Sequence, residues 1–185
     1  MKTTLVSTPI KDLYLVKIDY FQDKRGFFIE PWNKRDFSSA GLSVNFVQEG
    51  HSRSRQHVLR GLHYQDSTAP MGKLIRCTQG RIFDVAVDIR LQSSTFGQVF
   101  TTILTAEDKL SVYVPIGFAH GFLTLSSFAE VQYKQTGYYE PLAEGTILWN
   151  DSQLHIDWPI QSHPLLSERD QNGKTFVEYS KHPAF

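Results

Sequence analysis

Cysteine and long apolar runs are both scarce in this sequence. The single cysteine, Cys77, excludes an internal disulfide and a cysteine-based metal cluster. No apolar stretch approaches the roughly 20 residues that a transmembrane helix needs. Residues 1–10 contain Lys2 but lack the long apolar core of a signal peptide. We therefore expect a cytoplasmic protein that does not contact a membrane.

Net charge is also missing. Lys+Arg and Asp+Glu are equal at 19 each, so no general electrostatic field favours nucleic acid or a membrane surface. A site for an anion must therefore be built locally, from a few well-placed cations. The hydrophobic content of 41% and the charged content of 21% are typical of a globular chain, and the length of 185 residues predicts one domain, residues 1–185.

Helix signals are few, whereas short strand-like segments recur along the chain. Their regular spacing, with Gly, Pro and Asn between them, predicts an all-β sandwich or barrel. The expected strands are residues 13–19, 27–30, 43–48, 58–65, 73–78, 81–89, 98–104, 111–114, 119–125 and 128–138.

The segments between these strands carry predictions of their own. Asn33 predicts the N-cap of a short helix over residues 34–40, which ends at Gly41. Residues 51–56 are expected to form a polar loop, and Gln79-Gly80 a hairpin turn. After Pro141 the pattern weakens into a looser section with isolated strand pieces.

The stretch Val58–Gln65 combines a cation, a glycine and an imidazole on one expected strand. Arg60 and His63 flank Gly61, and a glycine inside a strand often marks a bulge or a close backbone approach. One interpretation is a pocket for an anionic ligand with a base in it; the other is a core histidine beside a solvated arginine. Strict alternation places Arg60 and His63 on opposite faces. Both can therefore reach one ligand only if Gly61 bulges or Arg60 lies at a strand edge.

Pro115–His120 fits the P-x-G-x-x-H signature of the second cupin motif. This motif places its histidine at the start of a strand, facing the interior of the barrel. In metal-binding cupins the first motif supplies H-x-H and a nearby Glu. The corresponding stretch here is His63-Tyr64-Gln65, and no Glu follows at the expected short spacing. Two histidines without a carboxylate form a poor cage for a catalytic divalent metal. We therefore expect the barrel without a metal.

Several further side chains each allow two interpretations. Lys73 is either an exposed strand-end lysine or an inward cation that stabilises a negative oxygen. Tyr133 is either a packed core tyrosine or a general acid that faces a histidine. Tyr138-Tyr139 either stacks on a base or closes the core. Asp170 reads as a solvated charge, and sequence spacing alone cannot connect it to His63.

Taken together, these residues resemble the dTDP-4-dehydrorhamnose 3,5-epimerase family. The resemblance implies a cupin-type jelly roll, a homodimer, no metal or cofactor, and epimerisation of a dTDP-linked 4-keto-6-deoxy sugar. The matching segments are residues 25–30, 46–49, 51–54, 58–65, 72–74, 83–88, 115–122, 133–134, 138–139, 149–151 and 166–168.

The resemblance also implies roles for particular residues. His63 resembles the base, oriented by Asp170, and Tyr133 the acid on the opposite face of the sugar. Lys73 resembles the group that stabilises the enolate oxygen. Gln48, Arg60 and His120 resemble contacts to the sugar or phosphate, and Tyr138 resembles the ring that stacks on thymine. Arg25 and Glu30 resemble contacts to the nucleotide, within reach of a partner subunit's site. The other residues that resemble substrate contacts are Phe28, Glu144 and Arg169.

Three positions depart from the family pattern. Glu49 and Gly50 stand where the family usually has Asp and Asn, and Arg169 stands where it usually has Lys. The Gly50 departure keeps a related 3-epimerase, which inverts one centre only, as the nearest alternative. A metal-dependent cupin oxygenase is disfavoured by Gln65. A non-catalytic sugar-nucleotide binding module requires loss of the base or the acid, and both His63 and Tyr133 are present.

Overall fold

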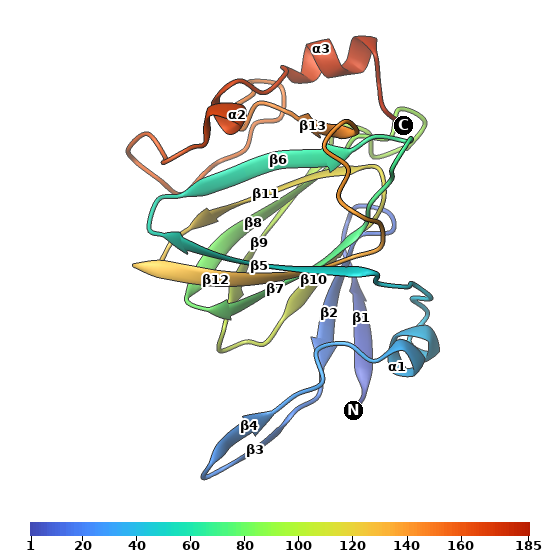
Figure 1. The fold of residues 1–185 in the computed structure, drawn as a ribbon, viewed down its shortest axis with the longest axis vertical. Coiled ribbons are helices and arrows are strands. Elements are labelled where there is room, and N and C mark those ends of the chain that lie inside the picture. Colours follow the sequence, from blue (N-terminus) through green and yellow to red (C-terminus); the bar gives the residue numbers. More distant parts are fainter.

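Two antiparallel sheets face each other in the main body of the computed structural model, which describes residues 1–185 (Figure 1). The six-stranded sheet has the order β1 (Thr3–Ser7), β2 (Tyr14–Ile18), β10 (Ser111–Val114), β7 (Lys73–Gln79), β12 (Phe128–Gln135) and β5 (Gln48–Arg55). The five-stranded sheet has the order β13 (Glu144–Thr146), β6 (Leu59–Gln65), β11 (Phe118–Thr124), β8 (Arg81–Asp88) and β9 (Val99–Thr105).

The space between the sheets is filled by side chains that alternate along each strand. Ile75 and Cys77 of β7 meet Ile82 and Ala86 of β8 and Phe122 of β11, and all five are buried. Every second residue of a strand points to the same face, so each sheet contributes one apolar face to this core. The expectation of an all-β jelly roll is confirmed.

The outer face of the five-stranded sheet is covered by the C-terminal section. Val85 and Val87 of β8 pack there against Phe176 and Tyr179 of α3 (Phe176–Lys181). Figure 1 shows α2 (Glu168–Gln171) and α3 above β6. These helices were not predicted, because the sequence after Pro141 has no long apolar periodicity. No helix in the structure is long and apolar enough to cross a membrane.

The predicted short helix is present as α1 (Lys34–Ser39). The Asn33 side chain accepts a hydrogen bond from the Arg35 backbone N–H, so Asn33 is the N-cap as expected. Phe37 is buried beside Leu74 of β7 and Tyr113 of β10. The helix thereby covers part of the outer face of the six-stranded sheet.

Two predictions around β5 were wrong, and one strand was missed. Residues 43–47 are not a strand, and the expected polar loop 51–56 lies almost wholly in β5, which pairs with β12 from Gln48↔Gln135 to Arg55↔Phe128. The polar composition of β5 concealed its alternation, because its inward residues are small rather than apolar. Strand β1 precedes the first expected strand and was missed.

Gln79-Gly80 does not close a hairpin. β7 and β8 belong to opposite sheets, so the chain crosses from one sheet to the other at Gly80. Gly80 has φ +76°, and a Cβ there would lie 2.2 Å from the Phe128 carbonyl oxygen. Only glycine fits this crossing, which local sequence cannot distinguish from a hairpin turn.

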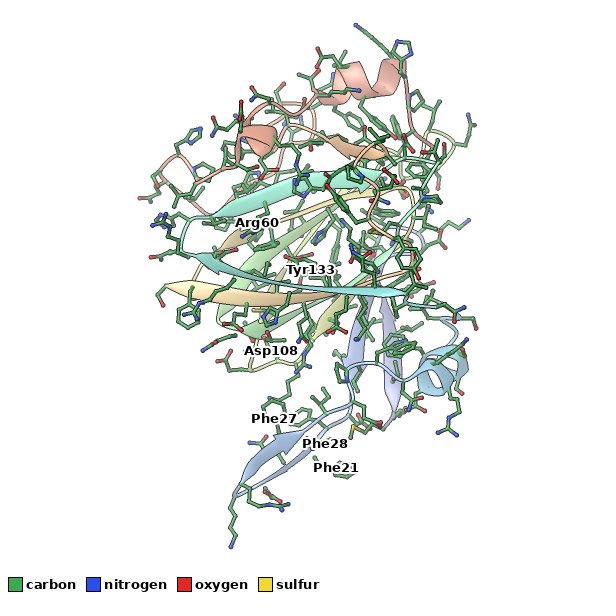
Figure 2. The ribbon with its side chains drawn as sticks, in the orientation of Figure 1. Phe21, Phe27, Phe28, Arg60, Asp108 and Tyr133 are labelled. Carbon is green, nitrogen blue, oxygen red and sulfur yellow. The ribbon has the colours of Figure 1, made fainter.

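A separate hairpin, β3 (Phe21–Asp23) and β4 (Gly26–Phe28), projects from the body (Figures 1 and 2). Its turn is formed by Lys24 and Arg25, between Asp23 and Gly26. Phe21 is 71% exposed and Phe28 63% exposed. Lys109 Nζ lies 4.4 Å from the ring centroid of Phe27 and so contacts the hairpin from the turn before β10. The hairpin pairs with no strand of the two main sheets.

Candidate active site

A bulge in β6 brings Arg60 and His63 to the same cavity. β6 pairs with β11 through His120↔His63 and Phe122↔Arg60, so β6 has one more residue than β11 between these pairs. Gly61 has φ +130°, and a Cβ there would lie 2.5 Å from the Gly121 Cα. Only glycine fits at this position. The bulge at Gly61 is one of the two conditions under which the sequence analysis expected Arg60 and His63 to share a site.

The cavity at this bulge lies between the two sheets and has a volume of about 240 Å³. Arg60 comes from β6 and Tyr133 from β12, on opposite sheets (Figure 2). Six of the residues that the sequence singled out line it, so the fold gathers segments far apart in the chain. The lining residues are Ser52, Arg60, His63, Lys73, His120, Phe122, Tyr133, Gln135 and Arg169.

Asp170 lies directly behind His63. The imidazole Nε2–H donates to the Asp170 Oδ1 at 2.5 Å, and the Ser167 hydroxyl donates to the other carboxylate oxygen at 2.7 Å. Ser167 is the N-cap of α2, so this short helix fixes the carboxylate, which is only 3% exposed. With Nε2 protonated, the neutral ring carries its lone pair on Nδ1.

The electrostatic surroundings of His63 favour its neutral form. Burial lowers the pKa of His63, and the hydrogen bond and charge of Asp170 only partly oppose this. The Arg169 guanidinium lies 3.1 Å from His63 Nε2 and lowers the pKa further. For Asp170, burial alone would raise the pKa, but the hydrogen bonds from His63 and Ser167 leave it lowered. The pair is therefore a neutral imidazole beside an ionised carboxylate.

Lys73 begins β7 and points into the cavity rather than to solvent. Burial lowers its pKa to about 8, while the charge of Glu144 raises it and that of Arg169 lowers it. Because this value still lies above neutrality, Lys73 supplies a positive charge in the cavity. Such a cation stabilises a developing oxyanion.

Tyr133 faces the cavity from β12. Burial raises its pKa to about 12, although the hydrogen bond with Ser52 and the charge of Arg60 act in the opposite direction. Its hydroxyl therefore carries a proton, and the Tyr133 Oη lies 2.6 Å from the Ser52 Oγ. The cavity thus holds a neutral imidazole and a protonated phenol.

Arg60 and His120 are each held by a partner that the sequence analysis did not single out. Arg60 Nε donates to the Ser54 hydroxyl at 3.0 Å, and His120 Nε2 lies 2.9 Å from the carboxylate of Asp84, a buried pair. Ser52 and Ser54 are two residues apart on β5 and so face the same side of the strand. Because residues 51–56 were expected to form a loop, this spacing was not recognised. Asp84 lies on a strand that was expected, but nothing in the sequence linked it to His120.

Gln65 anchors the loop that carries Tyr138. Its Nε2 donates to the carbonyls of Ala69 at 2.6 Å and Tyr138 at 3.1 Å, and its Oε1 accepts from the Glu140 N–H at 2.8 Å. At the position where metal-binding cupins carry a second histidine, this chain therefore has an amide that is engaged in holding a loop. No three His, Cys, Asp or Glu side chains are grouped as metal ligands.

Gln48 and Tyr138 lie near this loop. The Gln48 Oε1 accepts from the Tyr139 N–H at 3.0 Å, and Tyr138 is 71% exposed. Glu144 forms an ion pair with Arg169, and the Glu144 carboxylate also accepts a hydrogen bond from the Tyr139 hydroxyl at 2.9 Å. These contacts connect the loop, through Arg169, to the wall of the cavity.

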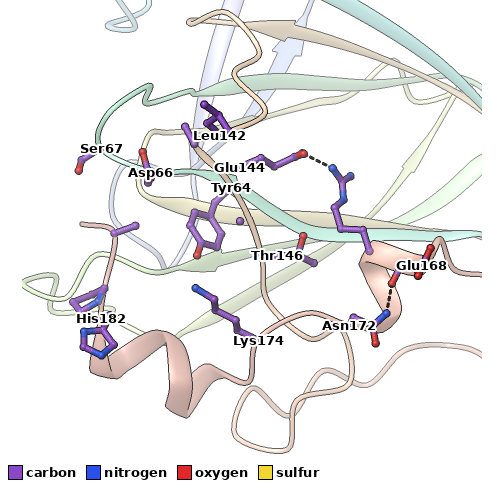
Figure 3. Close-up of a pocket in the computed structure, with 15 residues that line it drawn as sticks. Tyr64, Asp66, Ser67, Leu142, Glu144, Thr146, Glu168, Asn172, Lys174 and His182 are labelled. Carbon is purple, nitrogen blue, oxygen red and sulfur yellow. Dashed lines mark hydrogen bonds and ion pairs between the residues drawn. The ribbon is translucent and has the colours of Figure 1, made fainter.

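A larger hollow of about 850 Å³ lies beside β13 and the C-terminal helices (Figure 3). Tyr64, Lys174 and His182 line it, and the Glu144–Arg169 ion pair crosses one side. Arg169 also lines the smaller cavity. The larger hollow contains neither His63 nor Tyr133, so the acid–base groups define the smaller cavity as the reaction centre.

Arg25, Phe28 and Glu30 are not part of this cavity. Arg25 pairs with Asp23 at 2.6 Å at the tip of the projecting hairpin, and Phe28 ends β4. Glu30 follows two residues later. Within one chain, these three predicted substrate contacts therefore stand apart from the other ten site residues.

The fold and the cavity define a cupin-type jelly roll with an acid–base site. Its histidine, which is hydrogen-bonded to an aspartate of α2, and its tyrosine come from opposite sheets. The family model for dTDP-4-dehydrorhamnose 3,5-epimerase matches residues 7–178. The chain belongs to this family, as the sequence motifs indicated.

Individual relatives agree with this membership. The dTDP-4-dehydrorhamnose 3,5-epimerase of Pseudomonas aeruginosa is 51% identical over 179 residues, which are 96% of this chain and 97% of the relative. The solved Legionella pneumophila dTDP-6-deoxy-D-glucose-3,5-epimerase, in complex with dTDP-4-keto-L-rhamnose, has a TM-score of 0.90 and 44% identity, covering 95% of this chain and 93% of that one. The 3'-monoepimerase ChmJ of Streptomyces bikiniensis, in complex with dTDP-quinovose, has a TM-score of 0.88 and 30% identity, covering 94% and 88%.

Proposed function

We propose that the protein converts dTDP-4-dehydro-6-deoxy-D-glucose to dTDP-4-dehydro-L-rhamnose by epimerisation at C3 and C5 without a cofactor. The observation that carries this proposal is the placement of His63 and Tyr133 on opposite sheets of one cavity. A base and an acid that reach a ring from two sides are what inversion of a carbon centre requires. The relatives described above support the substrate.

The reaction follows from the chemistry of the 4-keto group. This carbonyl acidifies the hydrogens on C3 and C5. His63 takes one of these protons on its free nitrogen, and the electrons of the broken C–H bond move into an enolate. Lys73 stabilises the enolate oxygen. Tyr133 then donates its hydroxyl proton to the same carbon from the other face, which inverts that centre.

The size of the cavity divides the substrate into two parts. At about 240 Å³ it lies below the roughly 300–1,000 Å³ of typical ligand sites. The cavity therefore takes the sugar, next to Arg60 and His120, while the nucleotide extends along the rim. There the exposed ring of Tyr138 is free to stack on thymine.

The projecting hairpin completes the proposal. Arg25 and Phe28 are exposed on a two-stranded sheet that pairs with nothing else in the chain. In a homodimer this hairpin would supply Arg25, Phe28 and Glu30 to the nucleotide end of the partner subunit's site. We expect the dimer to work in the cytoplasm.

Incubation with dTDP-4-keto-6-deoxyglucose in deuterated water, followed by NMR of the sugar, tests the function. We expect deuterium at both C3 and C5 and inversion of both centres. Deuterium and inversion at C3 alone would instead show that the protein is a 3-epimerase, the alternative that Gly50 left open. Absence of any exchange would contradict both readings.

A further inference from the structure

Ser52 is the single hydrogen-bond partner of the Tyr133 hydroxyl. The two oxygens lie 2.6 Å apart, and either can be the donor. Tyr133 is opposite Gly50 in the β5–β12 ladder, and Ser52 follows Gly50 on the same inward face of β5. Both side chains also line the reaction cavity. The serine is therefore fixed beside the tyrosine by strand pairing over the whole length of both strands.

We propose that Ser52 is a positioning residue for proton donation: it holds the Tyr133 hydroxyl toward the sugar and donates a hydrogen bond to the phenolate that forms there. This inference rests on the proposed function, in which Tyr133 is the acid. It assigns to Ser52 a part in inversion and none in proton removal.

The proton balance shows why such a partner is needed. When Tyr133 protonates the enolate carbon, its O–H bond breaks, a C–H bond forms, and the electron pair remains on the phenolic oxygen. Burial disfavours this anion, as the raised pKa of Tyr133 shows. A serine hydroxyl can accept from the phenol before transfer and, after rotation about its C–O bond, donate to the phenolate afterwards.

Arg60 is the other group that favours a buried phenolate on Tyr133, and its side chain already has a hydrogen-bond partner. Arg60 favours the phenolate through its positive charge, but its Nε is held by Ser54 and it makes no hydrogen bond to the tyrosine. Ser52 is thus the group placed to contact the phenolate directly. Because hydrogen bonds to charged groups are stronger than neutral ones, its loss should slow inversion by about 10- to 100-fold.

The test compares deuterium exchange with inversion in four variants: Ser52→Ala, Ser52→Thr, Tyr133→Phe and the double variant Ser52→Ala/Tyr133→Phe. In Ser52→Ala we expect slow inversion, with exchange through His63 within about twofold of wild type. Ser52→Thr keeps the hydroxyl and should restore inversion. The double variant should be no slower than Tyr133→Phe, because the serine acts only through the tyrosine.

The outcomes separate this inference from the function on which it rests. If exchange and inversion fall by the same factor in Ser52→Ala, if neither falls, or if Ser52→Thr is as slow as Ser52→Ala, the role of Ser52 is wrong. An additional loss in the double variant would also overturn it. If Tyr133→Phe itself leaves the ratio of exchange to inversion unchanged, it is the assignment of the acid that fails.

Discussion

Replacing Asp170 with asparagine tests how the carboxylate prepares the base. Asn has nearly the same shape, and its amide can still meet the Ser167 hydroxyl that now donates to Asp170 at 2.7 Å. The charge is lost, however, together with the 2.5 Å charge-assisted hydrogen bond from His63 Nε2. An asparagine can also present its N–H₂ group to the ring and so favour the wrong tautomer.

The size of the effect follows from these contacts. Asp170 raises the pKa of His63 through both a hydrogen bond and its charge, whereas burial, Arg169 and Lys73 lower it. Without the carboxylate the base is weaker, and no buried anion remains to stabilise the imidazolium. By analogy with the equivalent change in a serine-protease triad, we expect kcat to fall by about 10³- to 10⁴-fold.

Steady-state kinetics and thermal unfolding together measure this prediction. The Asp170→Asn protein should fold, with KM changed much less than kcat. Asp108→Asn, which alters an exposed carboxylate in the turn before β10, is the matched control and should keep wild-type activity. A loss of less than tenfold in Asp170→Asn would refute the argument that the carboxylate prepares the base.

Three further predictions concern glycines and the nucleotide. Gly50→Ala should raise the free energy of unfolding by about 0.5–1 kcal/mol, because a Cβ there makes an ordinary 3.7 Å contact with Tyr133; an unchanged or lower value in urea would contradict this. Gly61→Ala should lower it by more than about 2 kcal/mol, because its Cβ would meet the Gly121 backbone; a stable, active variant would show that the bulge is dispensable. Tyr138→Ala should weaken dTDP binding by about 1–3 kcal/mol in calorimetry and leave pyrophosphate binding unchanged; unaltered dTDP affinity would pass the stacking role to another aromatic residue.

The pH dependence of the reaction gives a further check. His63 has a lowered pKa in the folded protein and acts in its neutral form. His63 should therefore be fully in its active form above the ordinary histidine pKa of about 6.5, and the acid limb should appear only as the pH falls through the lower folded value. On the alkaline side, activity should fall as Lys73, with its pKa of about 8, loses the charge that stabilises the enolate. His63 also contributes stability that is present above about 6.5 and is lost as the pH falls through its folded value. A kcat/KM profile with its acid limb above about 6.5 would contradict this assignment.

Local motifs predicted the parts of the fold that depend on nearby residues. The strand around Arg60 and His63 and the cupin motif that ends at His120 were recognisable because each combines β-forming residues with glycine at defined positions. The two motifs turned out to be neighbours: His63 and His120 are paired across β6 and β11. The bulge at Gly61 was anticipated from the conflict between strand alternation and a shared ligand.

The features that escaped prediction depend on contacts between distant segments. Whether β7 and β8 share a sheet is decided by their partners elsewhere in the chain, and Gln79-Gly80 is compatible with either result. The pairing of Asp170 with His63 spans 107 positions and requires the C-terminal section to fold over β6, so the spacing of the residues could not predict it and only the family resemblance indicated it. Ser52 was concealed in a polar segment that becomes a strand only because β12 supplies its hydrogen bonds.

The most direct test of the account is proton exchange by His63→Ala in deuterated water, measured by NMR on the dTDP-4-keto-6-deoxy sugar. One base serves both centres in this account, so wild-type protein should incorporate deuterium at C3 and C5, and His63→Ala should incorporate it at neither beyond the rate without enzyme. The melting temperature of the variant, with and without dTDP, establishes that it remains folded and still binds nucleotide. Exchange at the wild-type rate in a folded, nucleotide-binding His63→Ala protein would contradict the central claim that this imidazole is the base.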